Sequence, residues 1–381
     1  MDFTYDDEQQ ALREAVRGLL GKTYGDYETR RRTVAEDPGF DESMWGRLAE
    51  MGVLGLPFSE EDGGVGAGPV EVAIVGQEIG RVLAPEPFMT SVVVAGGLVA
   101  AAGSAEQRAD VLGGLAAGEK VLAFAHAEAG SRWVDTASDV TAKASSDGWT
   151  VSGTKEPVPH GARADVLVVS AALPDGGTGL FLVDGDAAGV SRTGYATHDG
   201  GRAARIDFAD ASAVALGDGD QSATIGNVLD HGRIVAANQA VGAMEIALEA
   251  TSDYLKSRKQ FGVTLNTFQS LTFRAADMYV SLELTRSIVA WATMVLAVED
   301  ADPTDVADAA SRATVQVSKA GRHIGKEAIQ LHGGIAMTAE YSVGAYTNHL
   351  TALDHLFGDG ANELRKLTAS VTGHEEVDPL A

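Results

Sequence analysis

The spacing of apolar residues changes twice along this chain of 381 residues, and no other feature restricts its fold as strongly. Up to about residue 120, apolar side chains recur at intervals of three and four, which predicts helices. From about residue 121 to 220 the interval approaches two, which indicates strands. Helical spacing then returns in longer segments. We therefore expect an α+β multidomain protein, with an all-α domain over residues 1–120, a central β-domain over 121–220 and an α-helical bundle over 221–381.

Particular segments give the first two domains their expected elements. Pro69–Val82 is predicted to form a helix that stops before Ala84–Pro87. Val140–Ala144 and Trp149–Gly153 are predicted to pair as strands around a turn at Ser146–Gly148. The later predicted strands are Val166–Ala171, Gly179–Val183 and Ala204–Phe208. No helical pattern separates them, so a β-sandwich or barrel is favoured over a parallel nucleotide-binding sheet.

The third domain carries three long amphipathic stretches. Apolar residues are spaced by three and four between residues 241 and 255, and again between 271 and 282. The third stretch, Val306–Leu331, follows Asp302-Pro303, which is typical of a helix cap and first turn. Long helices of this kind suit a four-helix bundle.

The composition limits the possible partners. The chain has 29 basic and 54 acidic side chains and a formal net charge of −25, so its surface repels nucleic acid and anionic lipid. Cysteine is absent, which excludes disulfides and cysteine nucleophiles, and the spacing of the histidines suggests no metal site. The acidic start lacks a signal-peptide pattern and no window has the length of a membrane span, so we expect a cytoplasmic location.

One helix of the predicted bundle ends in Arg258-Lys259-Gln260-Phe261-Gly262, and Gln269 follows. An ordinary helix C-terminus explains the cations, because they interact favourably with the helix dipole, and it explains the glycine as a helix cap. It does not explain the aromatic residue or the two glutamines. An arginine suits a diphosphate and a glutamine can bond to ribityl or ring groups, so we expect a ligand here.

A second helix ends at Gln330-Leu331-His332-Gly333-Gly334. Paired glycines allow a ligand to approach bare backbone. Taken alone, they are better explained by a simple helix cap.

Together with Gly55–Gly64, these two segments resemble the acyl-CoA dehydrogenase family, and the resemblance covers nearly the whole chain. It is closest to the small subunits of bacterial heteromeric members, such as that of pimeloyl-CoA dehydrogenase. The family fold is a helical domain, a β-domain and a four-helix bundle, in agreement with the periodicity. The resemblance implies FAD as cofactor, lying between the subunits of a tetramer.

The resemblance also implies which residues bind FAD. Those expected to reach the FAD of a neighbouring protomer are Arg258, Gln260, Phe261 and Gln269, and those expected to hold its diphosphate and adenosine half are Gln330, Gly333 and Gly334. For Phe261, a place in the bundle core is an equal alternative.

The segments that face flavin and substrate in the family match in part. The resemblance implies that Ser131 contacts an acyl-CoA, and that Asp230 and Arg233 contact the acyl-CoA or the loop that carries the base. However, Ala125-His126-Ala127 replaces the family's threonine–glutamate–proline run, and Pro157-Val158-Pro159 replaces a segment with a tryptophan and a hydroxyl side chain. The flavin would thus meet a flatter, more apolar wall with fewer hydrogen-bond donors.

The family's reaction needs a base that removes the proton next to the thioester carbonyl. The family's base is usually a glutamate before a glycine near the end of the bundle, and Asp359 stands at that place, while Gly232 occupies the other known position. An aspartate is one methylene shorter than a glutamate. The alternative is that Asp359 caps the last helix.

Two functions are therefore expected from the resemblance. The first is an FAD-dependent acyl-CoA dehydrogenase that forms a trans-2-enoyl-CoA and passes electrons to an electron-transfer flavoprotein, as a homotetramer or as a heterotetramer with a second acyl-CoA dehydrogenase subunit. The second is a non-catalytic subunit that supports the FAD of a catalytic partner. The sequence does not distinguish whether the acyl group of the substrate is dicarboxylyl, steroid-derived or fatty.

Overall fold

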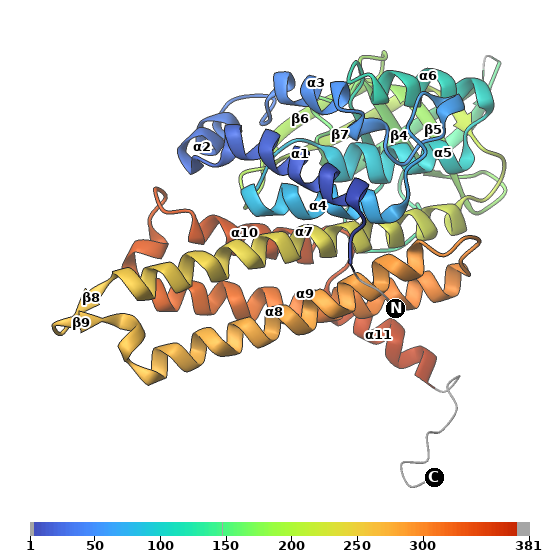
Figure 1. Ribbon diagram of the computed structural model, residues 1–381. Coiled ribbons are helices and arrows are strands. Elements are labelled where there is room, and N and C mark those ends of the chain that lie inside the picture. The colour runs from blue at the N-terminus through green and yellow to red at the C-terminus, as the bar shows by residue number, and fades with distance from the viewer. Residues whose placement is uncertain (1–3, 147, 372–381) are drawn as a thin grey trace, which may run out of the picture.

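The computed structural model describes residues 4–146 and 148–371, and its elements follow the predicted order of helices, strands and helices (Figure 1). The N-terminal elements are α1 (Asp7–Tyr24), α2 (Tyr27–Ala35), α3 (Glu42–Glu50), η1 (Val53–Gly55), η2 (Glu60–Asp62), α4 (Pro69–Val82), the π-helix η3 (Phe88–Gly96), α5 (Gly97–Ala102) and α6 (Ala105–Ala116). The central strands are β1 (Leu122–Ala125), β2 (Thr141–Ser145), β3 (Gly148–Pro159), β4 (Val166–Ala172), β5 (Thr178–Asp184), β6 (Val190–Ala196) and β7 (Arg202–Leu216). The C-terminal elements are α7 (Ser222–Ser257), β8 (Lys259–Gln260), β9 (Val263–Thr264), η4 (Leu265–Thr267), α8 (Gln269–Leu296), α9 (Pro303–His332), η5 (Gly333–Met337), α10 (Val343–Asp354) and α11 (Gly360–Ser370). The predicted fold class is confirmed.

The central strands form one sheet that is mostly antiparallel. β2 pairs with β3 as predicted, and Asp147, in the predicted turn between them, lies outside the described residues. Two strands, β1 and β6, were not predicted. β1 is buried along its whole length and pairs in parallel with β4, whereas most of β6 is exposed, so neither shows the alternation that marks a strand in sequence.

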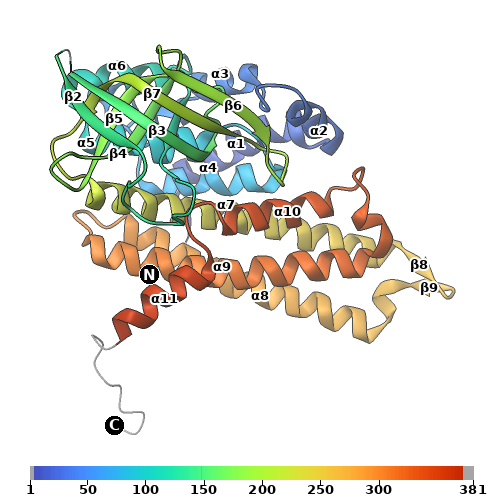
Figure 2. The same ribbon diagram turned by 180° about the vertical axis from the view of Figure 1, so that it is seen from behind.

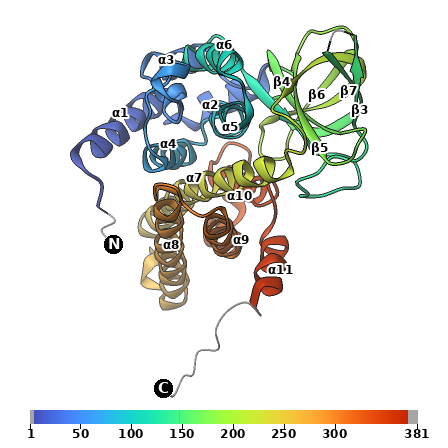
Figure 3. The same cartoon turned by 90° about the vertical axis from the view of Figure 1, so that its right-hand side faces the viewer.

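The helix α7 lies between the N-terminal helices and the rest of the bundle (Figure 3). Two glycines allow its close contact with α4. A Cβ atom at Gly80 would lie 1.9 Å from the carbonyl oxygen of Gln239, and one at Gly242 would lie 2.0 Å from that of Gln77. One apolar core therefore runs through both helical parts, while the sheet has a separate core.

The bundle contains α7, α8, α9 and α10, and the short hairpin β8–β9 projects from its end (Figure 2). The predicted start of α9 is confirmed, because the Asp302 carboxylate accepts a hydrogen bond of 2.8 Å from the backbone N–H of Thr304. Over residues 4–146 and 148–371, no helix is long and apolar enough to cross a membrane.

Candidate functional site

The first predicted ligand segment forms the hairpin at the end of the bundle (Figures 1 and 2). Its two turn residues, Phe261 and Gly262, have φ angles of 54° and 84°. Positive φ at both central residues is the geometry of a tight hairpin turn, which glycine adopts freely and phenylalanine does not. The Phe261 side chain is 92% exposed, so this turn holds an aromatic ring in solvent rather than in the bundle core.

The second segment lies beside the first. α9 ends at His332, and Gly333 follows with φ of 71°. A Cβ atom at Gly333 or Gly334 would meet no atom within 4 Å, so the backbone here is open. The centroid of the His332 ring lies 4.5 Å from that of Tyr254, which is in the last turn of α7. This contact brings the two segments to the same end of the bundle.

The polar side chains around these segments are exposed and mostly unengaged. No described carboxylate forms an ion pair with Arg258, and the Gln260 amide donates only to the neighbouring carbonyl of Lys259, at 2.8 Å. Gln269, at the start of α8, and Gln330 are also exposed. A free guanidinium, an exposed ring and open backbone fit the diphosphate, ring and adenosine groups of FAD. FAD binding by these residues remains a prediction.

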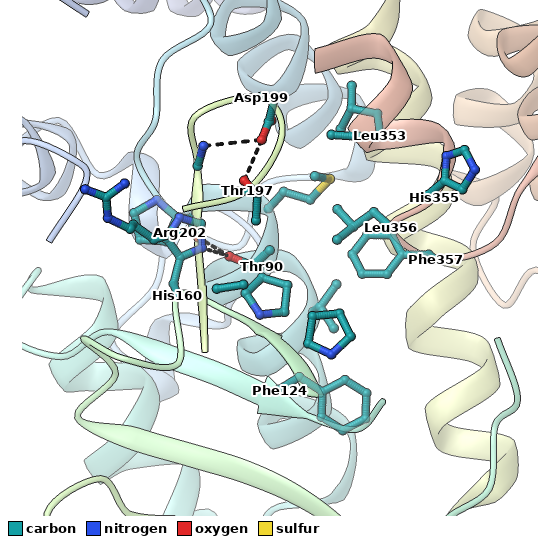
Figure 4. Close-up of a pocket in the computed structure, with 18 of the residues that line it drawn as sticks. Thr90, Phe124, His160, Thr197, Asp199, Arg202, Leu353, His355, Leu356 and Phe357 are labelled. Carbon is teal, nitrogen blue, oxygen red and sulfur yellow. Dashed lines mark hydrogen bonds between the residues drawn. The ribbon is translucent and has the colours of Figure 1, made fainter. Parts of the chain in front are cut away.

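A cavity of about 340 Å³ lies where the three parts of the chain meet. Figure 4 shows Leu353, Leu356 and Phe357 on one side of it and Thr90, His160 and Asp199 on the other, with Phe124 below. One side is therefore apolar and the other polar. All the lining residues lie before residue 240 or after residue 348, so the hairpin and the Gly333-Gly334 backbone take no part in this cavity.

Of the predicted substrate residues, Ser131 lines this cavity, whereas Asp230 and Arg233 do not. Arg233 is buried, lies 2.5 Å from the Asp230 carboxylate and donates two hydrogen bonds, of 3.0 and 2.8 Å, to the carbonyl of Phe357. Burial raises the pKa of Asp230 above its usual value, against the opposing positive charge of Arg233. This pair therefore holds the loop after α10 against α7.

That loop carries the predicted base, Asp359. Its carboxylate accepts a hydrogen bond of 2.7 Å from the backbone N–H of Asn362 and caps α11, which is the alternative that the sequence left open. Asp359 does not line the large cavity, although Leu356 and Phe357 do. Its role as a base remains a prediction.

The wall formed by His126, Pro157 and Pro159 offers few hydrogen-bond donors to the cavity. His126 is engaged at both ring nitrogens, at 2.8 Å with Ser170 and at 2.6 Å with the carbonyl of Val134. Its ring stacks on Phe124, and burial, together with the charge of Lys155, lowers its pKa to about 4. Prolines have no N–H. A flavin ring, which carries several acceptors, fits this wall poorly.

The polar side of the cavity was not found from the sequence. His349 on α10 bonds at 2.9 Å to Asp199, in the turn between β6 and β7, and at 2.9 Å to Gln239 on α7. Burial raises the pKa of Asp199, but hydrogen bonds from His349 and Thr197 outweigh it and hold the pKa well below its usual range. These side chains come from distant segments, so no local pattern marks them. Among the described residues, no group of three or more potential metal ligands is gathered.

Comparison with known proteins agrees with this architecture. Models of the acyl-CoA dehydrogenase N-terminal and C-terminal domains match residues 6–119 and 222–370. Acyl-CoA dehydrogenase IpdE2 of Mycobacterium tuberculosis is 30% identical, over 97% of this chain and 99% of that protein. A solved variant of the Tcur3481-Tcur3483 steroid ACAD is 32% identical with a TM-score of 0.87, over 96% of this chain and 98% of that one. A chain of the ChsE4-ChsE5 complex from Mycobacterium tuberculosis is 25% identical with a TM-score of 0.88, over 99% and 100%. This chain therefore belongs to the acyl-CoA dehydrogenase family of FAD-dependent enzymes.

Proposed function

We propose that this chain is a subunit of a heteromeric, FAD-dependent acyl-CoA dehydrogenase, and that it completes the FAD site of a second subunit that carries the base. The observation that carries the proposal is the exposed Phe261 ring beside the unpaired Arg258 and the open Gly333-Gly334 backbone. These groups lie outside this chain's own cavity, so a ligand held there would also contact a neighbouring subunit.

The chain's own cavity supports a base on the partner. The family pattern gives this chain one candidate base, Asp359, which caps a helix and does not line the cavity. The wall at His126, Pro157 and Pro159 lacks free donors for a flavin. The names of two solved relatives describe pairs of different chains, Tcur3481-Tcur3483 and ChsE4-ChsE5. A two-component enzyme is therefore favoured over a homotetramer.

An apolar stripe on α8 gives the partner a surface to cover. Phe273, Val280 and Leu284 are 63%, 55% and 59% exposed and lie on one face of the helix. Exposed apolar side chains in such a row are typical of a subunit contact. We assign this face to the second acyl-CoA dehydrogenase subunit.

In the assembled enzyme, FAD would supply the hydride acceptor for converting an acyl-CoA to a trans-2-enoyl-CoA, with an electron-transfer flavoprotein as the next acceptor. This chain would contribute Arg258 to the diphosphate and Phe261 and Gln260 to the far end of the cofactor. Ser131 lines this chain's own cavity, and its predicted contact with acyl-CoA belongs to the alternative in which this chain is itself catalytic.

The test is co-expression with a second, glutamate-bearing subunit, followed by measurement of bound FAD and of its anaerobic bleaching by acyl-CoA. Arg258→Ala should lower FAD affinity about tenfold, because a charge-assisted bond to phosphate is lost. Lys256→Ala is the matched control, since it removes a nearby exposed cation that has a partner, Asp253, at 3.6 Å. Equal FAD affinity in both variants would contradict the proposal.

A second candidate is that this chain is itself catalytic, with Asp359 as the base. It is favoured by the position of Asp359 two residues after the cavity-lining Phe357, between Gly358 and Gly360. Asp359→Asn in the complex separates the two functions. If bleaching of the flavin by acyl-CoA is unchanged, Asp359 is not the base; if it is abolished while FAD stays bound, the catalytic assignment holds.

A further inference from the structure

The polar side of the cavity contains a hydroxyl group that is engaged by two partners. The Thr90 hydroxyl lies 2.9 Å from Nδ1 of His160 and 3.4 Å from the backbone carbonyl of Pro87. Thr90 and His160 are partly buried, and both line the cavity (Figure 4).

The chemistry of the partners decides where the Thr90 proton lies. A carbonyl oxygen only accepts, and Nδ1 of a neutral imidazole accepts or donates according to its tautomer. The Thr90 hydroxyl therefore donates to Nδ1 of His160 or to the Pro87 carbonyl. Burial lowers the pKa of His160 to about 4, which keeps the ring neutral at neutral pH. The Thr90 oxygen thus presents lone pairs, and no proton, to the cavity.

The backbone around this site is held in unusual conformations. Thr90 belongs to η3, a nine-residue π-helix, a rare form found frequently at functional sites. Of the six described non-glycine residues with positive φ, three line the cavity: Leu83, Trp133 and His160. Such conformations cost free energy and persist where the surrounding structure fixes them, often at ligand sites.

The charged groups in the wall argue against an anionic ligand. Asp199 presents a carboxylate on the same side as Thr90. The two arginines of the wall are engaged, Arg202 with Asp37 at 3.1 Å and Arg30 with the carbonyls of Leu83 and Asp199. A neutral ligand with a hydrogen-bond donor is therefore favoured.

We propose that this cavity binds a neutral apolar molecule with one hydroxyl group, which donates a hydrogen bond to Thr90 while its apolar body lies against Phe124, Leu353 and Phe357. The volume of about 340 Å³ lies in the range of pockets that hold small organic ligands. This site shares no residue with the hairpin that the proposed function uses. Either assignment can therefore fail without the other.

The experiment uses three probes of about nine non-hydrogen atoms each, 1-octanol, heptyl methyl ether and 2-octanone, on the purified protein with or without its partner subunit. Only the alcohol can donate a hydrogen bond. By ligand-observed NMR titration, 1-octanol should bind about threefold to tenfold more tightly than the other two, the value of one neutral hydrogen bond. Thr90→Val should remove this preference and Thr90→Ser should keep it.

Thr251→Val is the matched control, because its buried hydroxyl donates to the carbonyl of Ala247 and lies outside the cavity wall. It should leave the preference unchanged. Equal binding of the three probes, tighter binding of 2-octanone, or a preference that survives in Thr90→Val would overturn the proposal. Failure of all three probes to bind while the complex still holds FAD would overturn it too, and would leave the proposed function intact.

Discussion

The centroids of the Tyr254 and His332 rings lie 4.5 Å apart, with 31° between the ring planes, and this contact joins the end of α7 to the end of α9. His332 is fixed further by a hydrogen bond of 2.8 Å from Nδ1 to the carbonyl of Ala328 and by the ring of Tyr341 at 5.1 Å. The hairpin after α7 and the open backbone after α9 are therefore positioned by one aromatic cluster, although they are far apart in the sequence.

Removal of the Tyr254 ring should weaken FAD binding through this cluster. Because an aromatic pair contributes about 0.5–1.5 kcal/mol beyond the burial of its area, we expect Tyr254→Ala to raise the Kd for FAD roughly threefold to tenfold. The measurement is a fluorescence titration of FAD into the flavin-free complex. Tyr195→Ala, a change on β6, is the control. A lower melting temperature with an unchanged Kd would show that the contact stabilises only the bundle.

The crossing of α4 and α7 should tolerate no side chain at Gly80. A Cβ atom there would lie 1.9 Å from the Gln239 carbonyl, so Gly80→Ala should force the helices apart and lower the free energy of unfolding by about 1–3 kcal/mol. Gly46→Ala is the matched control. Gly46 lies inside α3, and a methyl group added there would meet no atom within 4 Å, so alanine should stabilise the chain by up to about 1 kcal/mol. Urea unfolding measures both, and equal effects would refute the close crossing.

A buried carboxyl group should make stability fall as the pH rises. Burial raises the pKa of Glu86 from 4.5 to about 7, against the opposing hydrogen bond from Tyr24. The native chain thus keeps a proton that the unfolded chain loses above pH 4.5, so this stabilisation is complete at lower pH and is lost as the pH rises towards 7. Between pH 5.5 and 7.5 this group should lower the free energy of unfolding by about 2 kcal/mol.

Glu86→Gln should remove that part of the pH dependence, because glutamine does not titrate. Urea unfolding at pH 5.5 and 7.5 gives the difference for both proteins. Glu61→Gln, a change at an exposed carboxylate, serves as the control and should behave as the wild type does. A slope that is identical in the wild type and in Glu86→Gln would show that Glu86 is ionised in the folded chain.

The buried ion pair beneath the cavity wall should be costly to break on one side. Lys155 is fully buried, and its Nζ lies 2.7 Å from Glu128 and 2.9 Å from the carbonyl of His126. Lys155→Met leaves the Glu128 carboxylate without its cation, so the free energy of unfolding should fall by about 3–5 kcal/mol. The double variant Lys155→Met/Glu128→Gln should recover part of this loss. A double variant no more stable than the single one would contradict the pairing.

Local sequence determined the order of domains and much of the helical structure. Helical periodicity requires only that residues three and four positions apart share a face, and helix caps are equally local. These patterns therefore located α4 at Pro69–Val82 and the start of α9 at Asp302-Pro303. It failed for β1 and β6, which are uniformly buried and mostly exposed, because alternation appears only when one face of a strand is covered.

The sequence also marked the two predicted ligand segments, the first by its aromatic residue and glutamines and the second through the family resemblance. Only the tertiary structure decided that they meet, through Tyr254 and His332, and that Phe261 points to solvent. It likewise brought Thr90 to His160 and set Asp359 as a helix cap. Contacts between residues far apart in the chain depend on how whole elements pack, and no short pattern records that packing.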